Sequence, residues 1–116
     1  MSLIFVFGSN LGGRHGKGAA KFAVSNFGAI YGRGKGMQGR SYAIPTKDAN
    51  LNSLPLSEVK EHIHDFIDHA KTSDDTFLLT PIGCGLAGNS KAEIWSILKE
   101  IGLPSNVVLA SSWVND

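Results

Sequence analysis

Short apolar runs alternate along this chain with stretches whose apolar residues recur at helical spacing. The apolar runs lie at 3–7, 41–44, 76–82 and 106–110, and a helical pattern follows each of the first three. Continuous apolar runs are typical of strands covered on both faces of a parallel sheet. Strands that alternate with helices favour right-handed βαβ units. The sequence therefore predicts an α/β protein, a three-layer α/β/α sandwich with a mostly parallel sheet.

Two helix starts carry recognisable signals. Ser90 and Glu93 have the S-x-x-E spacing of a capping box before a helix at 91–101. Ser57 is in position to cap a helix at 57–71. Apolar residues expected on the buried faces of the first two helices are Ala19, Ala20, Phe22, Ala23, Phe27, Val59, Ile63, Phe66, Ile67 and Ala70.

The fourteen glycines are the unusual feature of the composition, and they cluster at 8–18, 28–39 and 83–88. The first and last clusters each join a strand to a helix. There the bare backbone can approach an anion, and unpaired N–H groups lie at the positive end of the helix dipole. The middle cluster has too many glycines for a helix, and we expect it to be a mobile loop.

Pro45 follows the apolar run at 41–44, and we expect it to end the strand pairing there. Lys47 and Asp48 would then lie at the exit of this strand. Ligands of such sheets bind at the carboxyl ends of the strands. We therefore expect these two side chains and the three glycine clusters to converge on one cleft.

Charge and cysteine content exclude several classes of protein. A net charge of +1 with 18% charged residues argues against a strongly basic nucleic-acid coat, although it leaves room for a local basic patch. Cys84 is the single cysteine, so an intramolecular disulfide is excluded. With no signal peptide and no long apolar run, we expect a cytoplasmic protein with no membrane partner. His62, His64 and His69 do not share one helix face, so we expect a solvated face and no metal site.

The sequence does not match the P-loop motif and matches the dinucleotide-binding motif only in part. The P-loop string G-x-x-x-x-G-K-[ST] is absent. The string G-x-G-x-x-G occurs at 34–39, before a strand, and at 83–88, between a strand and a helix. The second copy lacks the acid that a dinucleotide-binding fold places at the end of the next strand. A small NAD-binding domain is therefore the less favoured alternative.

The strings VFGSNLGGRHGKGAAKFA, SYAIPTKD and IGCGLAG together resemble the macro domain, an ADP-ribose-binding α/β/α module. The resemblance covers most of the chain and implies a single macro-like domain at 1–116. SYAIPTKD and PIGCGL are similar to the branch in which a lysine after the short central strand removes ADP-ribose from glutamate or from DNA bases. Lys47, which follows Thr46, matches that lysine.

Two departures from the family pattern bear on the ligand. The aspartate that holds the adenine amino group in macro domains has no match in this sequence, which puts adenine recognition in doubt. The acid that follows GCGL in glutamate-directed members is replaced by Ala87. Asp48 is the nearest acid to Lys47 in sequence and is the candidate to replace it.

The resemblance implies Lys47 as the nucleophile, with Asn10 orienting the ribose and Asp48 assisting. The alternatives are an exposed lysine at a strand end and an asparagine that forms a turn. Cys84 lies near a helix start that would lower its pKa, but a small buried filler is favoured. Residues expected to contact the ligand are Gly8, Ser9, Gly12, Gly13, His15, Gly16, Lys17, Gly18, Thr46, Gly83, Cys84, Gly85, Leu86, Ala87 and Gly88.

The sequence thus predicts binding of ADP-ribose or a related nucleotide diphosphate, without metal or cofactor. The protein would either hydrolyse ADP-ribosyl linkages or act as a non-catalytic reader. Its partners would then include ADP-ribosylated protein or nucleic acid. Tyr31 and Tyr42 lie near the middle glycine cluster, where each could either stack on a base or belong to the core.

Overall fold

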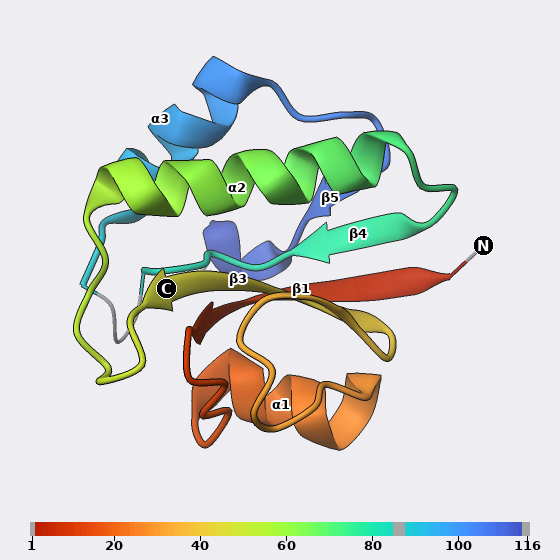
Figure 1. Cartoon of the computed structure of the whole chain (residues 1–116). Helices are drawn as coiled ribbons and strands as arrows, with labels where there is room; N and C mark the ends of the chain where they lie inside the picture. The colour runs from red at the N-terminus through yellow and green to blue at the C-terminus, as the bar shows by residue number, and fades with distance from the viewer. Residues whose placement is uncertain (1, 85–87, 115–116) are drawn as a thin grey trace.

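A five-stranded sheet runs through the molecule (Figure 1). The computed structural model describes residues 2–84 and 88–114. The spatial order of the strands is β2-β3-β1-β4-β5. Only β2 is antiparallel, pairing with β3, and the other neighbours are parallel. The strands are β1 (Leu3–Asn10), β2 (Gly36–Gln38), β3 (Ser41–Lys47), β4 (Thr76–Leu79) and β5 (Val107–Leu109).

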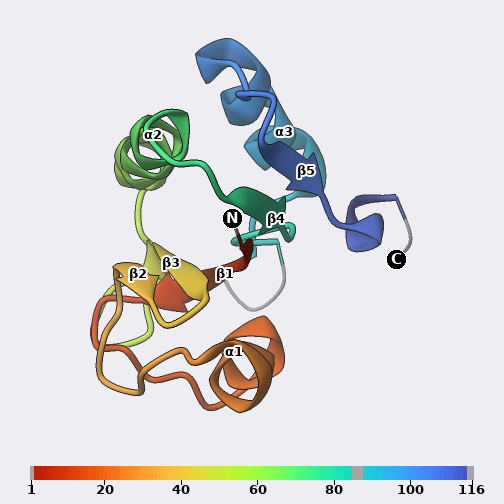
Figure 2. The ribbon, with the colours of Figure 1, turned by 90° about the vertical axis from the view of Figure 1, so that its right-hand side faces the viewer.

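Helices cover both faces of this sheet. Figure 2 shows α1 (Gly18–Phe27) on one side of the sheet and α2 (Leu56–Lys71) and α3 (Lys91–Ile101) on the other. A short 3-10 helix, η1 (Ser111–Trp113), follows β5. The predicted α/β sandwich with a mostly parallel sheet is therefore confirmed. Within the described ranges no helix combines the length and the apolar character needed to cross a membrane.

Each face of the sheet has its own core because the side chains of β1 alternate between them. Ile4 and Val6 join the larger core under α2 and α3. Phe5 and Phe7 join a smaller core with Ala20 and Ala23 of α1. These small alanines let the α1 backbone lie close to the sheet. Of the other apolar residues predicted to be buried in this helix, Phe27 is half-buried, while Ala19 and Phe22 are exposed, so the prediction for those two is wrong.

The apolar face of α2 was predicted correctly, whereas its start was not. The helix begins at Leu56 after Pro55, and Ser57 lies inside its first turn, where it does not act as the cap. The buried residues of α2 are Val59, Ile63, Phe66, Ile67 and Ala70.

β3 continues through Pro45 to Lys47, so the prediction that Pro45 ends the strand is wrong. The carbonyl of Arg40 accepts from the Phe5 N–H, which by alternation places the nitrogen of Pro45 on the edge away from β1. β2 pairs with β3 only as far as Ala43, so no ladder hydrogen bond is lost at Pro45.

The segment at 28–39 is also more ordered than a simple loop, since it contains β2. It packs against the loop that follows β1. A Cβ added to Gly34 would lie 2.2 Å from the backbone oxygen of Asn10, and one added to Gly13 would lie 2.3 Å from the carbonyl carbon of Gly32. The Ser9 hydroxyl donates to the Gly34 carbonyl. The segment at 28–39 therefore supports the loop that follows β1, which carries the glycine cluster at 8–18.

β4 ends at Leu79, earlier than the predicted 76–82. After it, the Ile82 N–H donates to the Thr80 carbonyl at 2.7 Å and turns the chain away from the sheet. β5 likewise covers less than the predicted 106–110. The helix at 91–101 has the predicted bounds and the predicted capping box.

Replacing Gly34 by alanine should destabilise the fold by about 2 kcal/mol or more, because the new methyl group would overlap backbone that cannot move aside. Urea unfolding curves measure this loss. Gly16→Ala is the matched control, since nothing lies within 4 Å of its added Cβ. Equal stability of the two variants would contradict the close packing of the segment at 28–39.

Candidate functional site

The carboxyl ends of β1, β3 and β4 meet with almost no side chain between them. A Cβ on Gly8 would lie 3.1 Å from the backbone nitrogen of Gly83. A Cβ on Gly83 would lie 3.2 Å from the Thr46 methyl carbon. The Asn89 N–H donates to the Gly83 carbonyl at 3.0 Å and closes the loop that follows β4. Two glycines and the small Thr46 side chain therefore lie at the point where these strand ends meet.

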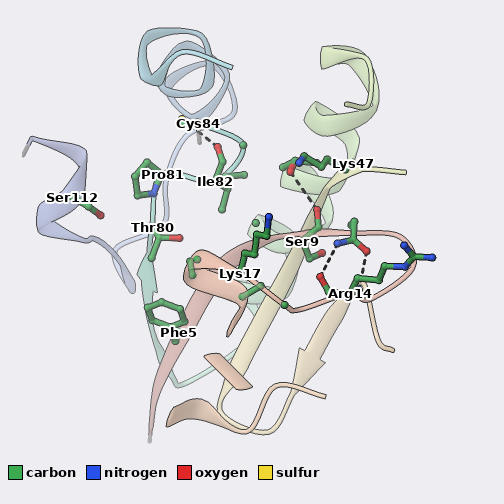
Figure 3. Close-up of a pocket in the computed structure, with 18 of the residues that line it drawn as sticks. Phe5, Ser9, Arg14, Lys17, Lys47, Thr80, Pro81, Ile82, Cys84 and Ser112 are labelled. Atoms are coloured by element: carbon green, nitrogen blue, oxygen red, sulfur yellow. Dashed lines mark hydrogen bonds between the residues drawn. The ribbon is translucent and has the colours of Figure 1, made fainter. Parts of the chain in front are cut away.

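A cavity of about 980 Å³ opens over these strand ends (Figure 3). Its volume is at the upper end of the range of small-molecule sites. It brings together two of the three glycine clusters and the end of β3. The predicted site residues that line it are Gly8, Ser9, Asn10, Gly16, Lys17, Gly18, Thr46, Lys47, Gly83 and Cys84.

The other predicted contacts are not among the described lining residues. Gly85, Leu86 and Ala87 are outside the described residues. Gly12, Gly13, His15, Asp48 and Gly88 do not line the cavity. His15 is 2% exposed, and its Nε2 donates to the Arg33 carbonyl at 2.8 Å. It thereby holds the segment at 28–39 in place, away from the expected phosphate position.

Cationic side chains gather among the described residues that line the cavity. Arg14, Lys17, Lys47 and Lys91 line it, and none of the described lining residues is an aspartate or glutamate. In Figure 3 the Arg14 guanidinium extends away from the other labelled side chains, whereas Lys17 rises beside Ser9. The Lys91 ammonium donates to the Ser112 carbonyl at 2.7 Å, which ties the start of α3 to η1. This balance of charge suits an anionic ligand.

The N-terminus of α1 is available to such an anion. Its N-cap, Lys17, makes no side-chain capping bond, and Gly18, Ala19 and Ala20 line the cavity. The first N–H groups of a helix have no partner within the helix. They therefore add backbone donors and the positive end of a dipole to the four cationic side chains.

The N-terminus of α3 differs because the chain caps it with its own carboxylate. The Glu93 N–H donates to the Ser90 hydroxyl at 3.1 Å, and the Ser90 N–H donates to the Glu93 carboxylate at 3.0 Å. These hydrogen bonds lower the pKa of Glu93. The capping box that signalled this helix in the sequence thus occupies the positions that an anion would take.

The Asn10 side chain closes its own loop. Its amide nitrogen donates to the Arg14 carbonyl at 3.0 Å, and its oxygen accepts from the Arg14 N–H at 2.9 Å. Asn10 is 7% exposed, and it also lines the cavity. The turn-forming alternative is therefore observed, and a role in orienting a ribose stays a prediction.

The Asp48 side chain likewise accepts hydrogen bonds from its own loop. Its Oδ1 accepts from the N–H groups of Asn50 and Asn52, both at 2.9 Å. The loop that follows β3 is folded around this carboxylate. Lys47, in contrast, is half-buried and lines the cavity, and neither of the ion pairs between described residues involves it.

Cys84 is half-buried, and its thiol donates to the Ile82 carbonyl at 3.3 Å. Burial raises the pKa of this thiol, while the nearby Lys91 lowers it by a smaller amount. The expectation that the helix start would lower the pKa is therefore wrong. A thiol that stays protonated is compatible with the expected role as a filler of the cavity wall.

Several lining residues were not among those predicted, notably Arg14, Tyr31, Leu51, Lys91 and Ser112. Tyr31 had a signal in the sequence, as an aromatic beside a glycine cluster. Tyr42, its companion in that expectation, is a 5% exposed core residue. Leu51 had no signal, because its place depends on how the loop after β3 folds.

Among the described residues, no group of three metal-ligating side chains comes together.

Comparisons with known proteins do not identify this chain. No family model, no curated protein and no solved structure matches it. The macro-domain resemblance therefore rests on the sequence strings alone, and the functional argument rests on the geometry of the cavity.

Proposed function

We propose that this cavity binds the diphosphate of ADP-ribose or of a related nucleotide. The observation that carries the proposal is the position of Lys17 and Lys47: both line the cavity, and neither of the ion pairs between described residues involves either lysine. The uncapped start of α1 supports it, because backbone N–H groups and the helix dipole favour phosphate oxygens. The glycines at the strand ends support it as well, since they let a ligand approach the backbone.

The uncharged residues that line the cavity are also compatible with a nucleotide. Phe5, Ile82 and Leu51 supply apolar surface. The hydroxyls of Ser9, Thr46 and Thr80 donate to backbone carbonyls, so towards a ligand their oxygens act as acceptors. Binding sites for small molecules commonly combine an apolar lining with a few convergent polar groups. The macro-domain resemblance favours ADP-ribose within the class of nucleotide diphosphates. The alternative of a small NAD-binding domain keeps the diphosphate and differs only in the second nucleoside.

ADP-ribose should bind to the wild-type protein, and Lys17→Ala should weaken binding roughly tenfold, as expected for a charge-assisted contact. Isothermal titration calorimetry at low ionic strength measures both affinities. Lys71→Ala is the matched control, because it removes the same charge at the end of α2, away from the lining residues. The absence of binding by the wild-type protein to ADP-ribose, to NAD and to nucleoside diphosphates would overturn the proposal.

Hydrolysis of an ADP-ribosyl linkage is a second candidate function, favoured by the position of Lys47 in the same cavity. The neutral amine would attack the anomeric carbon, so that a C–N bond forms while the glycosidic bond breaks. The leaving group would take the bonding electrons and a proton from the amine. One water molecule would then hydrolyse the adduct, releasing ADP-ribose and the free lysine.

Lys47→Ala should abolish turnover of ADP-ribosylated protein or DNA while ADP-ribose affinity stays within a few-fold of the wild type. Lys47→Arg is the informative companion, because it keeps the positive charge and removes the nucleophilic amine. Release of ADP-ribose, followed by chromatography, is the measurement. Wild-type binding without turnover would favour the non-catalytic reader, and turnover by the Lys47→Arg variant would rule out the lysine mechanism.

A further inference from the structure

Tyr31 presents an unusually accessible aromatic ring at the cavity. It is 64% exposed and lines the cavity, although it lies in the segment at 28–39 that otherwise packs behind the site. Exposed tyrosines are common, but this one is held in place. The Ile30 N–H donates to the Gln38 side-chain oxygen at 2.8 Å, and the Arg33 N–H donates to the Ile30 carbonyl at 3.0 Å. The ring is thus carried on a fixed turn.

A buried histidine supports the Tyr31 ring edge-on. The ring centroids of His15 and Tyr31 lie 6.2 Å apart with an interplanar angle of 74°, and His15 meets Phe7 edge-on at 5.2 Å. The Tyr31 ring is therefore braced by a buried neighbour, while 64% of the residue stays exposed.

Leu51 brings a second apolar side chain to the cavity from the loop after β3. It is 44% exposed and lines the cavity. Its φ of 66° makes it the one non-glycine residue with positive φ in the described chain, a conformation that is unfavourable for residues with a Cβ. The Leu51 N–H donates to the Asp48 carbonyl at 3.1 Å, so the Asp48-centred loop maintains this conformation.

The loop at 10–14 lies between these two side chains. On one side a Cβ on Gly12 would lie 3.5 Å from Ala49, and on the other side the Gly32 N–H donates to the Gly13 carbonyl at 2.8 Å. Arg14 ends this loop, and Lys47 pairs with Asn10 at the end of β3. Tyr31 and Leu51 thus lie on opposite sides of the loop at 10–14, and both line the cavity.

We propose that Tyr31 forms a nucleobase subsite at the edge of the cavity, with the base stacked on its ring. A base offers the tyrosine ring a planar apolar face, and stacking of this kind accepts any base. The base belongs either to the bound nucleotide itself or to a single-stranded nucleic acid that reaches the cavity. The subsite rests on the proposed diphosphate site only for the position of the phosphates.

The test uses two probes, ADP-ribose and a short fluorescein-labelled oligothymidylate, with Tyr31→Ala and Tyr31→Phe variants. Removing the ring should weaken binding of the probe that places a base here by roughly five- to hundredfold, whereas phenylalanine should retain wild-type affinity. Ile30→Ala is the matched control, because Ile30 is a neighbouring exposed apolar residue outside the lining.

Loss of affinity for ADP-ribose would assign the subsite to the base of the nucleotide, and loss for the oligonucleotide alone would assign it to a nucleic-acid strand. If Tyr31→Ala binds both probes as the wild type does while Lys17→Ala is impaired, the subsite is wrong and the diphosphate site stands. If the wild type binds neither probe, both proposals are overturned.

Discussion

The close approach of backbone to backbone at the strand ends is the constraint on which the rest of this structure depends. Gly8 and Gly83 are so near each other that a methyl group on the first would press on the backbone of the second. This contact keeps the loops after β1 and β4 side by side and leaves the space above them open. Larger residues at either position would fill the cavity floor or separate the strands. The cavity is therefore a consequence of two missing side chains.

Glycines also allow close backbone packing behind the loop that follows β1. Gly34 and Gly13 let the segment at 28–39 pack directly against the loop that follows β1. Ser9 and His15 then fasten the two segments through the carbonyls of Gly34 and Arg33. Because the loop at 10–14 is supported from behind and closed by Asn10, its lysine and arginine neighbours project from a defined base. Preorganised positive charge loses less conformational entropy when an anion binds.

The two helices that begin beside the cavity differ in whether a side chain caps their first N–H groups. The start of α3 is satisfied by Ser90 and Glu93, which stabilises the helix and places a carboxylate where a phosphate would otherwise go. The start of α1 has a lysine as its N-cap and small residues in its first turn. An anion can therefore approach α1 without displacing a competing side chain. Under the proposed function, the start of α1 is therefore the expected anion site.

Periodicity in the sequence predicted the sheet, the buried stripe of α2 and the capping box of α3, because each of these depends on residues close in the chain. The extension of β3 through Pro45 depended on which edge of the strand its nitrogen faces, and this is decided by pairing with distant β1. Similarly, the types of side chain at Asn10, His15 and Asp48 predicted ligand contacts, and Asn10 alone of the three lines the cavity. Their hydrogen bonds to local or neighbouring backbone, which only the folded loops reveal, show that all three hold loops together.

The most direct test of the central claim is a titration of the protein with ADP-ribose, followed by amide proton–nitrogen correlation spectra. We expect the largest saturable shifts at Gly16, Gly18, Ala19 and Ala20, around the start of α1, with smaller changes at Ser90 and Ala92 around the start of α3. Shifts concentrated at α3, or none at the start of α1 when the ligand is in excess, would contradict the assignment of the anion site.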